Sequence, residues 1–147
     1  MIKTRAIFIV VLVLNVLASL TGCERILSGA ERAAVLAYSE TATDNLLAGL
    51  NANDYAAFSR DFDTDMQKVM PATNFAVLKQ DLDNKLGNYL SRQIDRVTQS
   101  DEFYVVVYRA KFEQEESVIV EVAFHVKEPH PIAHLSFDSD KLRWSSQ

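Results

Sequence analysis

Cysteine is nearly absent from this chain of 147 residues, since Cys23 is the only one. A single thiol excludes an intramolecular disulfide, and no second cysteine is present to act as a catalytic thiol. The four glycines form no Gly-x-Ser-x-Gly elbow, the turn that exposes a nucleophilic serine in many hydrolases. The composition therefore excludes a disulfide-stapled fold and provides no recognisable arrangement for nucleophilic catalysis.

Positive charge is also scarce. The chain has 15 Lys and Arg residues against 20 Asp and Glu residues, a net charge of −5. An acidic domain has no electrostatic reason to bind nucleic acid or anionic lipid headgroups. The charges are interspersed, and no internal repeat or low-complexity tract is visible. We therefore predict one domain with a solvated surface and no nucleic-acid partner.

The one long apolar run is too short to cross a membrane. It covers residues 6–20, whereas a spanning helix takes about 20 residues. Lys3 and Arg5 precede it, and Leu20-Thr21-Gly22-Cys23 ends it. A basic start, an apolar middle and small residues before a cleavage point are typical of an export signal, so we predict that residues 1–22 are a signal peptide. An uncleaved anchor and an incidental thiol are the alternatives.

A lone cysteine at this place resembles the lipobox of prokaryotic lipoproteins. The resemblance implies that a diacylglycerol is attached to Cys23 and that cleavage leaves this residue as the new N-terminus. Two acyl chains suffice for stable anchoring, whereas one chain binds a bilayer only marginally. Residues 23–29 are then the lipidated cysteine and a short tether. The protein is expected to be exported and held on the outer side of the cell membrane, or on the outer membrane if the host has two.

Hydrophobic spacing predicts that a long helix opens the domain. Ser28 and Glu31 match the capping box that starts a helix. Apolar side chains then recur at spacings of three and four from Val35 to Leu50, which places them on one helical face. Residues 51–54 are predicted to form a loop that ends in an N-cap.

Two further helical regions are predicted before the strands begin. The first covers residues 55–70 and is expected to break near residues 61–63, because aspartate disfavours helix interiors. Pro71 ends it. The second runs to Leu86, and Gly87 directly after it is a plausible C′ residue.

After residue 87 the hydrophobic period changes from 3.6 to 2, which is typical of strands. Clear alternation covers residues 104–112 and 118–126, and weaker alternation covers 89–99 and 132–137. Strands joined by short turns pair antiparallel as a meander. Helices followed by strands predict an α+β domain, with the N-terminal helices packed on a curved four-stranded antiparallel sheet.

A set of core and turn residues is distinctive over residues 30–143: Asn53-Asp54-Tyr55, Phe58, Asp61-Phe62-Asp63, Met66, Leu86-Gly87, Tyr104 to Tyr108, Ala110-Lys111-Phe112, Leu135-Ser136-Phe137 and Lys141-Leu142. In these residues the sequence resembles the DUF3887 domain, and the order of the elements resembles the cystatin-like cone of the NTF2-like superfamily. The resemblance implies a curved sheet around a helix layer, with a conical cavity that many relatives use for binding and some for catalysis. DUF3887 domains resemble sensor or accessory modules.

The aromatic side chains of the predicted inner face are the candidates for lining such a cavity. They are Tyr38, Tyr55, Phe58, Phe62, Phe75, Tyr104, Tyr108, Phe112 and Phe124. Packing into a closed core is the alternative, and buried tyrosine hydroxyls need hydrogen-bond partners in either case. If a cavity is open, Asp95 and Glu121 are the strand-borne acids that could move a proton in it, as in a ketosteroid-isomerase type of enzyme acting on a small apolar molecule.

Metal binding is not favoured by the spacing of the ligand-type residues. Residues 61–65 begin like a calcium loop, but an EF-hand needs glycine at its sixth position and glutamate at its twelfth, where this chain has Met66 and Ala72. His125, His130 and His134 lie on or between adjacent predicted strands, and nothing in their spacing requires a shared zinc ion. We predict no cofactor and no metal.

The outer face of the predicted sheet is half apolar. It carries Phe103, Val105, Val107, Ile119 and Ala123 beside Arg109, Glu121 and His125. Such a face suits a homodimer or a protein partner, unless the C-terminal segment with Leu142 and Trp144 folds back over it. Together these features predict a lipoprotein that is anchored through Cys23 and carries a non-catalytic binding domain. Its small-molecule ligand is not identified by the sequence.

Overall fold

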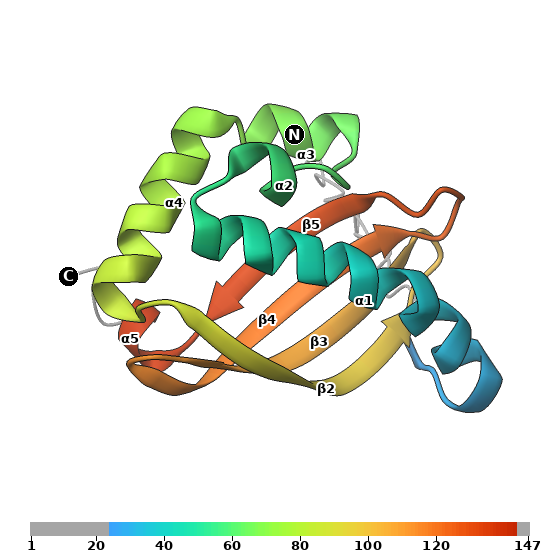
Figure 1. Cartoon of the computed structure of the whole chain (residues 1–147). Helices are drawn as coiled ribbons and strands as arrows, with labels where there is room; N and C mark the ends of the chain where they lie inside the picture. The colour runs from blue at the N-terminus through green and yellow to red at the C-terminus, as the bar shows by residue number, and fades with distance from the viewer. Residues whose placement is uncertain (1–23, 144–147) are drawn as a thin grey trace, which may run out of the picture.

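The computed structural model describes residues 24–143, which form an α+β fold with the helices first, as predicted (Figure 1). The helices are α1 (Gly29–Ala52), α2 (Tyr55–Phe58), α3 (Thr64–Val69), α4 (Ala72–Lys85) and α5 (Asp140–Arg143). The strands are β1 (Arg25–Ile26), β2 (Tyr89–Gln99), β3 (Phe103–Phe112), β4 (Glu115–His125) and β5 (Ile132–Asp138). They make one open antiparallel sheet in the order β1-β2-β3-β4-β5, and α1 runs across its inner face.

The sheet has five strands where four were predicted. The additional strand, β1, pairs antiparallel with the end of β2, placing Ile26 opposite Thr98. Leu27 then donates its backbone N–H to the Val97 carbonyl at 2.8 Å, and its side chain is only 3% exposed. The expected tether is therefore wrong for residues 25–27, which belong to the folded domain.

α1 begins where predicted, but the predicted capping box does not stabilise its N-terminus. Ser28 is the N-cap residue of α1, yet its side chain makes no capping hydrogen bond. Glu31 accepts instead from the Arg25 guanidinium at 2.7 Å, so the expected capping box is wrong. The acidic side chain still lies near the positive end of the helix dipole, where negative charge is favourable.

Aspartate caps separate the short helices, as the predicted break near residues 61–63 requires. Asp54 accepts from the Ala57 N–H at 3.1 Å and starts α2. Asp63 accepts from the Met66 N–H at 2.6 Å and starts α3. Each carboxylate satisfies a backbone donor that has no partner inside its own helix.

The predicted end of α4 is confirmed. Gly87 has a φ of 73°, a conformation that favours glycine, and its N–H donates to the Leu82 carbonyl at 3.1 Å. Pro71 is the N-cap residue of α4. No helix within residues 24–143 combines the length and the apolar character needed to span a bilayer.

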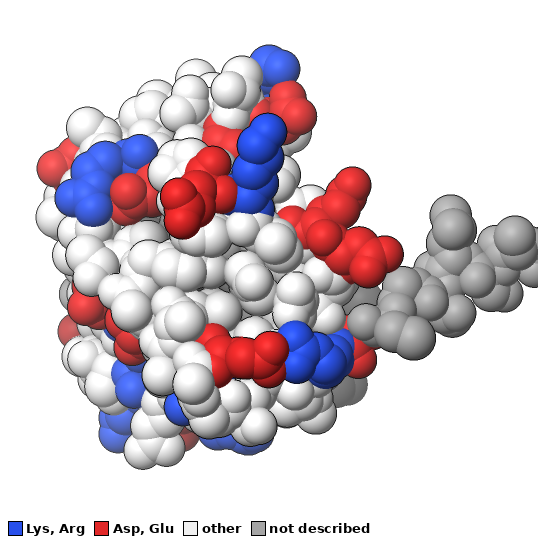
Figure 2. Space-filling model, turned by 90° about the vertical axis from the view of Figure 1, so that its right-hand side faces the viewer, with Lys and Arg blue, Asp and Glu red and all other residues white. Residues whose placement is uncertain are grey.

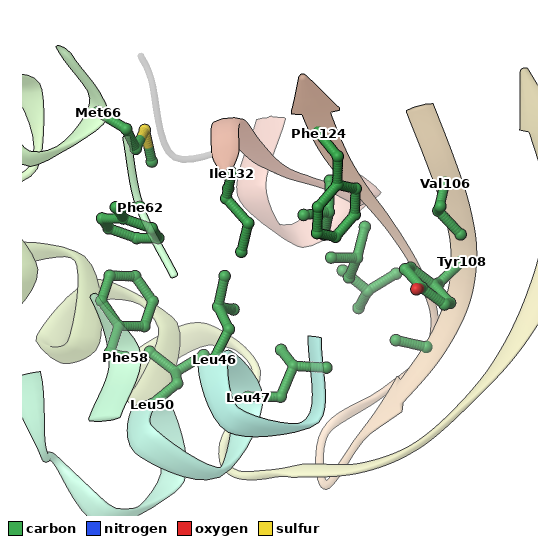
Figure 3. Close-up of a cluster of buried hydrophobic side chains, with 14 of the residues drawn as sticks. Leu46, Leu47, Leu50, Phe58, Phe62, Met66, Val106, Tyr108, Phe124 and Ile132 are labelled. Carbon is green, nitrogen blue, oxygen red and sulfur yellow. The ribbon is translucent and has the colours of Figure 1, made fainter. Parts of the chain in front are cut away.

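One hydrophobic core joins the helices to the inner face of the sheet. In Figure 3, Leu46, Leu47 and Leu50 of α1 lie between Phe58 and Phe62 on one side and the strands on the other. Gly49 permits close packing of α1 on α2, because a Cβ there would lie 2.8 Å from the Phe58 Cα.

Candidate functional site

Two turns, β1 and the first turn of α1 lie together at one end of the sheet, which we call the hairpin end (Figure 1). The turns are residues 100–102, between β2 and β3, and residues 126–131, between β4 and β5. The Val126 N–H donates to the Glu102 carbonyl at 2.9 Å and ties the two turns to each other. The hairpin end is therefore a surface built from four parts of the chain.

Two hollows open beside each other at the hairpin end. The larger has a volume of about 520 Å³ and is lined by Tyr38, Thr41, Ala42, Arg60, Asp61, Phe62, Pro129, His130 and Pro131. The smaller has a volume of about 320 Å³ and is lined by Leu27, Glu31, Ala34, Val35, Tyr38, Gln99, Tyr104 and His130. Because Tyr38 and His130 line both, we call the pair of hollows the Tyr38–His130 groove.

His130 is held in a defined orientation by its own turn. Its φ is 60°, its N–H donates to the Lys127 carbonyl at 3.0 Å, and its Nδ1 lies 2.9 Å from the His125 carbonyl oxygen. A carbonyl oxygen only accepts, so Nδ1 carries the proton that points to it. In the neutral ring, Nε2 then presents a lone pair, and it makes no hydrogen bond within residues 24–143.

Aromatic contacts hold Tyr38 against this imidazole. The Tyr38 and His130 rings are stacked, with centroids 4.2 Å apart and planes at 9°. Phe124 meets the Tyr38 ring edge-on at 5.7 Å, and Tyr104 meets the His130 ring at 6.3 Å. The stacked pair forms a fixed partition between the two hollows.

The hydroxyl of Tyr38 is buried and has no hydrogen-bond partner among the described residues. Burial raises the pKa of Tyr38, and the nearby Tyr104 adds to this effect, so the phenol keeps its proton at neutral pH. A buried donor without a partner costs free energy that a bound acceptor would recover. Tyr38 and His130 therefore supply one unused donor and one unused acceptor.

The wall formed by the α2–α3 linker is fixed to β5 by backbone hydrogen bonds. The Ile132 N–H donates to the Asp61 carbonyl at 2.7 Å, and the Asp63 N–H donates to the Ile132 carbonyl at 2.9 Å. These bonds flank a parallel bridge between Phe62 and Ile132. At the rim, the Arg60 guanidinium pairs with the Asp61 carboxylate at 3.1 Å.

Asp63 also connects this wall to the last residue of β4. Its Oδ2 lies 2.7 Å from Nε2 of His125, while its Oδ1 caps α3. Burial raises the pKa of the Asp63 carboxyl, but the hydrogen bonds from the Met66 N–H and from His125 outweigh burial, and the net pKa is lowered. Asp63 is therefore a carboxylate at neutral pH that joins the start of α3 to the end of β4.

The structure separates the predicted cavity aromatics into groove and core residues. Tyr38, Phe62 and Tyr104 line the groove. The Tyr55 hydroxyl donates to the Met70 carbonyl at 3.0 Å, away from it. The others are buried in the core: Phe58, Phe75, Tyr108, Phe112 and Phe124.

Tyr108 belongs to a polar network under α1. Its hydroxyl donates to Glu40 Oε1 at 2.7 Å, so Thr43 Oγ1, at 3.1 Å, donates to it in turn. The Arg92 guanidinium lies 5.0 Å from the centre of the Tyr108 ring and pairs with Asp44 at 2.7 Å. Burial raises the pKa of Tyr108, and donation to Glu40 raises it further, against the opposing effects of Thr43 and Arg92. The hydroxyl is therefore a fixed neutral donor.

The two strand-borne acids lie on the outer face of the sheet rather than among the inner aromatics. Asp95 pairs with Arg109 and with Arg96, at 2.9 Å in both cases. The Arg109 guanidinium is the main reason why the pKa of Asp95 is lowered. Glu121 lies 3.8 Å from Arg96, and Val107, directly between these two in the sheet register, is 1% exposed. The ion pairs thus cover the centre of the outer face.

The remaining candidates fall outside the groove. His134 is exposed on β5, and residues 24–143 contain no group of three or more metal-ligand side chains. Leu142 packs beside Leu135 and Phe137 against the core, so the alternative in which Leu142 covers the outer face is wrong. Cys23 and Trp144 lie outside the described residues.

Sequence reasoning placed Tyr38 on the inner face and His130 in a turn, but it did not bring them together. The one local signal was the position of His130 between Pro129 and Pro131, because flanking prolines restrict the backbone of a turn. The stacked pair depends on how the β4–β5 turn approaches α1, which no spacing in the sequence reveals.

The fold and the groove together define a small α+β domain with one aromatic-lined hollow surface at its hairpin end. Residues 43–128 match the family described as protein of unknown function DUF3887, and the chain belongs to this family. Neither the curated proteins nor the solved structures include a match. Tyr38 and His130 both lie just outside the matched residues.

Proposed function

We propose that this protein is an exported lipoprotein, anchored through Cys23, whose DUF3887 domain binds a small ligand in the Tyr38–His130 groove without transforming it. The observation that carries the binding proposal is the buried Tyr38 hydroxyl, which has no partner, beside an imidazole whose Nε2 is also unused. A hollow that combines aromatic walls with a few polar groups is typical of small-molecule sites.

The geometry favours a ligand with a planar ring and a polar edge. The stacked rings and Phe62 offer flat apolar surfaces, which suit an aromatic or other planar group. The Tyr38 hydroxyl would donate to a ligand acceptor, such as a carbonyl oxygen. His130 Nε2 would accept from a ligand N–H or O–H group.

Support for binding without catalysis comes from the acids of the groove. Asp61 is paired with Arg60, and Glu31 with Arg25. Arg25 lowers the pKa of Glu31 through its hydrogen bond, which is opposite to the raised pKa that a general acid or base needs near neutral pH. We therefore favour a binding domain over a cavity enzyme.

Imidazole NMR tests the binding proposal. The detergent-solubilised protein is labelled with ¹⁵N-histidine and titrated with fragments that carry a planar ring and a carbonyl group. At least one fragment should shift the His130 signals while the exposed His134 stays unchanged, and Tyr38→Ala should abolish that shift. If no fragment shifts His130, or if His134 moves equally, the groove is not a ligand site.

A separate experiment tests the anchor. We expect the wild-type chain to incorporate labelled fatty acid and to partition into membranes, because the segment Leu20-Thr21-Gly22-Cys23 resembles a lipobox. Cys23→Ser removes the thiol that would be modified, and Ser28→Ala is a matched control outside the signal. Unchanged fatty-acid labelling and membrane partitioning of the Cys23→Ser variant would contradict the proposed anchor.

We also propose that the domain belongs to the NTF2-like superfamily. Helices packed on one face of a curved antiparallel sheet suit the NTF2-like and cystatin-like superfamily. In that arrangement the groove occupies one end of the space between α1 and the sheet. Fold alone does not specify a ligand, so the binding proposal rests on the groove residues.

A further inference from the structure

We infer that the hairpin end of the domain faces the bilayer, so that the Tyr38–His130 groove opens at the membrane surface. This inference rests on the proposed lipid at Cys23 and adds an orientation to it. The partner is the headgroup region of the membrane in which the lipid is inserted.

Only one peptide bond separates Cys23 from the first residue that the structure describes. Glu24 follows Cys23 directly, and consecutive Cα atoms are about 3.8 Å apart. Glu24 Oε1 accepts from the Thr98 hydroxyl at 2.7 Å, and Arg25 already pairs with Gln99 in the sheet. Glu24, which directly follows the proposed attachment point, is therefore held beside the last residues of β2.

β1 pairs with the end of β2 that lies at the hairpin end of the sheet. Thr98 and Gln99 immediately precede the β2–β3 turn, which belongs to the hairpin end. The opposite end of the sheet carries the β3–β4 turn at Gln114, and β3 has 10 residues, which span roughly 35 Å. A lipid inserted beside Thr98 thus brings the hairpin end to the surface and leaves the opposite end far from it.

The surface chemistry of the hairpin end fits contact with a membrane through apolar groups. Ile26, in β1, is 70% exposed, the highest value among the four large apolar side chains that are exposed within residues 24–143. Figure 2 looks onto the hairpin end, where charged groups of both signs surround a largely uncharged middle. Because no single charge dominates, the contact should not depend on anionic lipid.

The groove shares this end, which has a consequence for its ligand. Leu27 and Gln99 line the smaller hollow and are direct neighbours of the β1 pairing. A ligand that enters the groove therefore arrives within reach of the headgroup layer. The domain is placed to bind a molecule at the outer surface of the membrane, close to where its own lipid is inserted.

Site-directed fluorescence quenching tests the orientation. The full chain is expressed, purified with its lipid and reconstituted into phosphatidylcholine vesicles that contain a headgroup spin-labelled lipid. Asp101→Cys at the hairpin end and Gln114→Cys at the opposite end are labelled with bimane in separate samples. Both residues are exposed, and the thioether formed at Cys23 leaves no competing thiol. We expect several-fold stronger quenching at position 101, and equal or reversed quenching would overturn the inference.

Two controls separate the orientation from the anchor on which it rests. The parent chain should float with the vesicles and take up no bimane. A parent that takes up the probe or stays in solution overturns the lipid attachment, and the orientation with it. A variant with a flexible Gly/Ser linker inserted between Cys23 and Glu24 should float equally but lose the difference between the two probes. Retention of that difference would show that β1 does not set the orientation.

Discussion

Individual buried polar side chains fix the position of α1 on the sheet. Thr43 and Tyr108 are both fully buried, and their hydroxyls bond to each other across the core. The chain then continues to Glu40, whose carboxylate also approaches Arg92. A hydrogen-bonded chain of this kind tolerates only one register of the helix, because any shift leaves buried groups without partners.

Tyr108→Phe should destabilise the domain by leaving the Thr43 hydroxyl buried without its partner. We expect a loss of about 1–3 kcal/mol in the free energy of unfolding. Thr43→Val alone should cost less, because the Tyr108 hydroxyl still donates to Glu40. The double variant should cost less than the sum of the two single variants, since it removes both ends of one bond. Urea denaturation of the four proteins gives the coupling, and strict additivity would contradict the predicted bond.

Asp63 should make the stability of the domain depend on pH. Its pKa is below the ordinary value of 3.8 in the folded state, so its contribution is present above the unfolded pKa and is lost as the pH falls through the folded pKa. Asp63→Asn keeps an oxygen for the cap of α3 but removes the charge. The variant should be less stable than the wild type by about 1 kcal/mol near neutral pH.

The two stability curves should converge as the pH falls below about 4, where the wild-type carboxylate takes up its proton. Chemical denaturation at several pH values measures this convergence. Asp63→Ala also removes the cap and should cost about 1 kcal/mol more than Asp63→Asn at every pH. A constant difference between the wild type and Asp63→Asn over the whole acid range would contradict the assignment of the shift to this residue.

Gly49→Ala should destabilise the domain although alanine is the better helix former. A Cβ at this position would collide with the backbone of Phe58, which cannot rotate away as a side chain can. We expect a loss of about 1–3 kcal/mol, as for other overpacked cores. The exposed neighbour Ala48→Gly measures the helix propensity alone and should cost about 1 kcal/mol. Stabilisation by Gly49→Ala would show that α1 and α2 can separate freely.

At the scale of the elements, the hydrophobic periodicity of the sequence predicted most of the helices and strands. The end of α4 follows from Gly87, and the strands β3 and β4 follow from an alternation that lasts many residues. A strand of two residues has no period, so β1 could not be predicted. Its partners lie far along the chain, since Glu24 and Thr98 are 74 positions apart. The groove was missed for the same reason, because the contact between Tyr38 and His130 is set by tertiary packing.

Leu27→Ala tests whether the segment after the anchor belongs to the core. The Leu27 side chain is 3% exposed, and truncating a buried leucine costs about 2–5 kcal/mol. Ile26→Ala is the matched control, since Ile26 is 70% exposed and its truncation should cost less than about 0.5 kcal/mol. Equal effects in urea denaturation would mean that residues 25–27 are a tether after all.

At the scale of the whole molecule, the folding unit is larger than the family match. Residues 43–128 leave out residues 24–42, with β1 and the first half of α1, and residues 129–143, with β5 and α5. The omitted parts provide three buried core side chains, namely Leu27, Val35 and Ile132. They also include Tyr38 and His130, so the groove does not exist without them.

A fragment of residues 43–128 should therefore fail to fold cooperatively, whereas residues 24–143 should unfold in one transition. Without β5, the inner side chains of β4 lose their neighbours on one side, and Val122 and Phe124, both fully buried in the whole domain, become exposed. A small domain that loses this much apolar burial cannot offset the conformational entropy of folding. Circular dichroism during urea denaturation, together with the spread of amide proton shifts in NMR, distinguishes the two fragments. A cooperative transition and dispersed shifts in 43–128 would contradict the prediction and would place the groove on a separable extension of the domain.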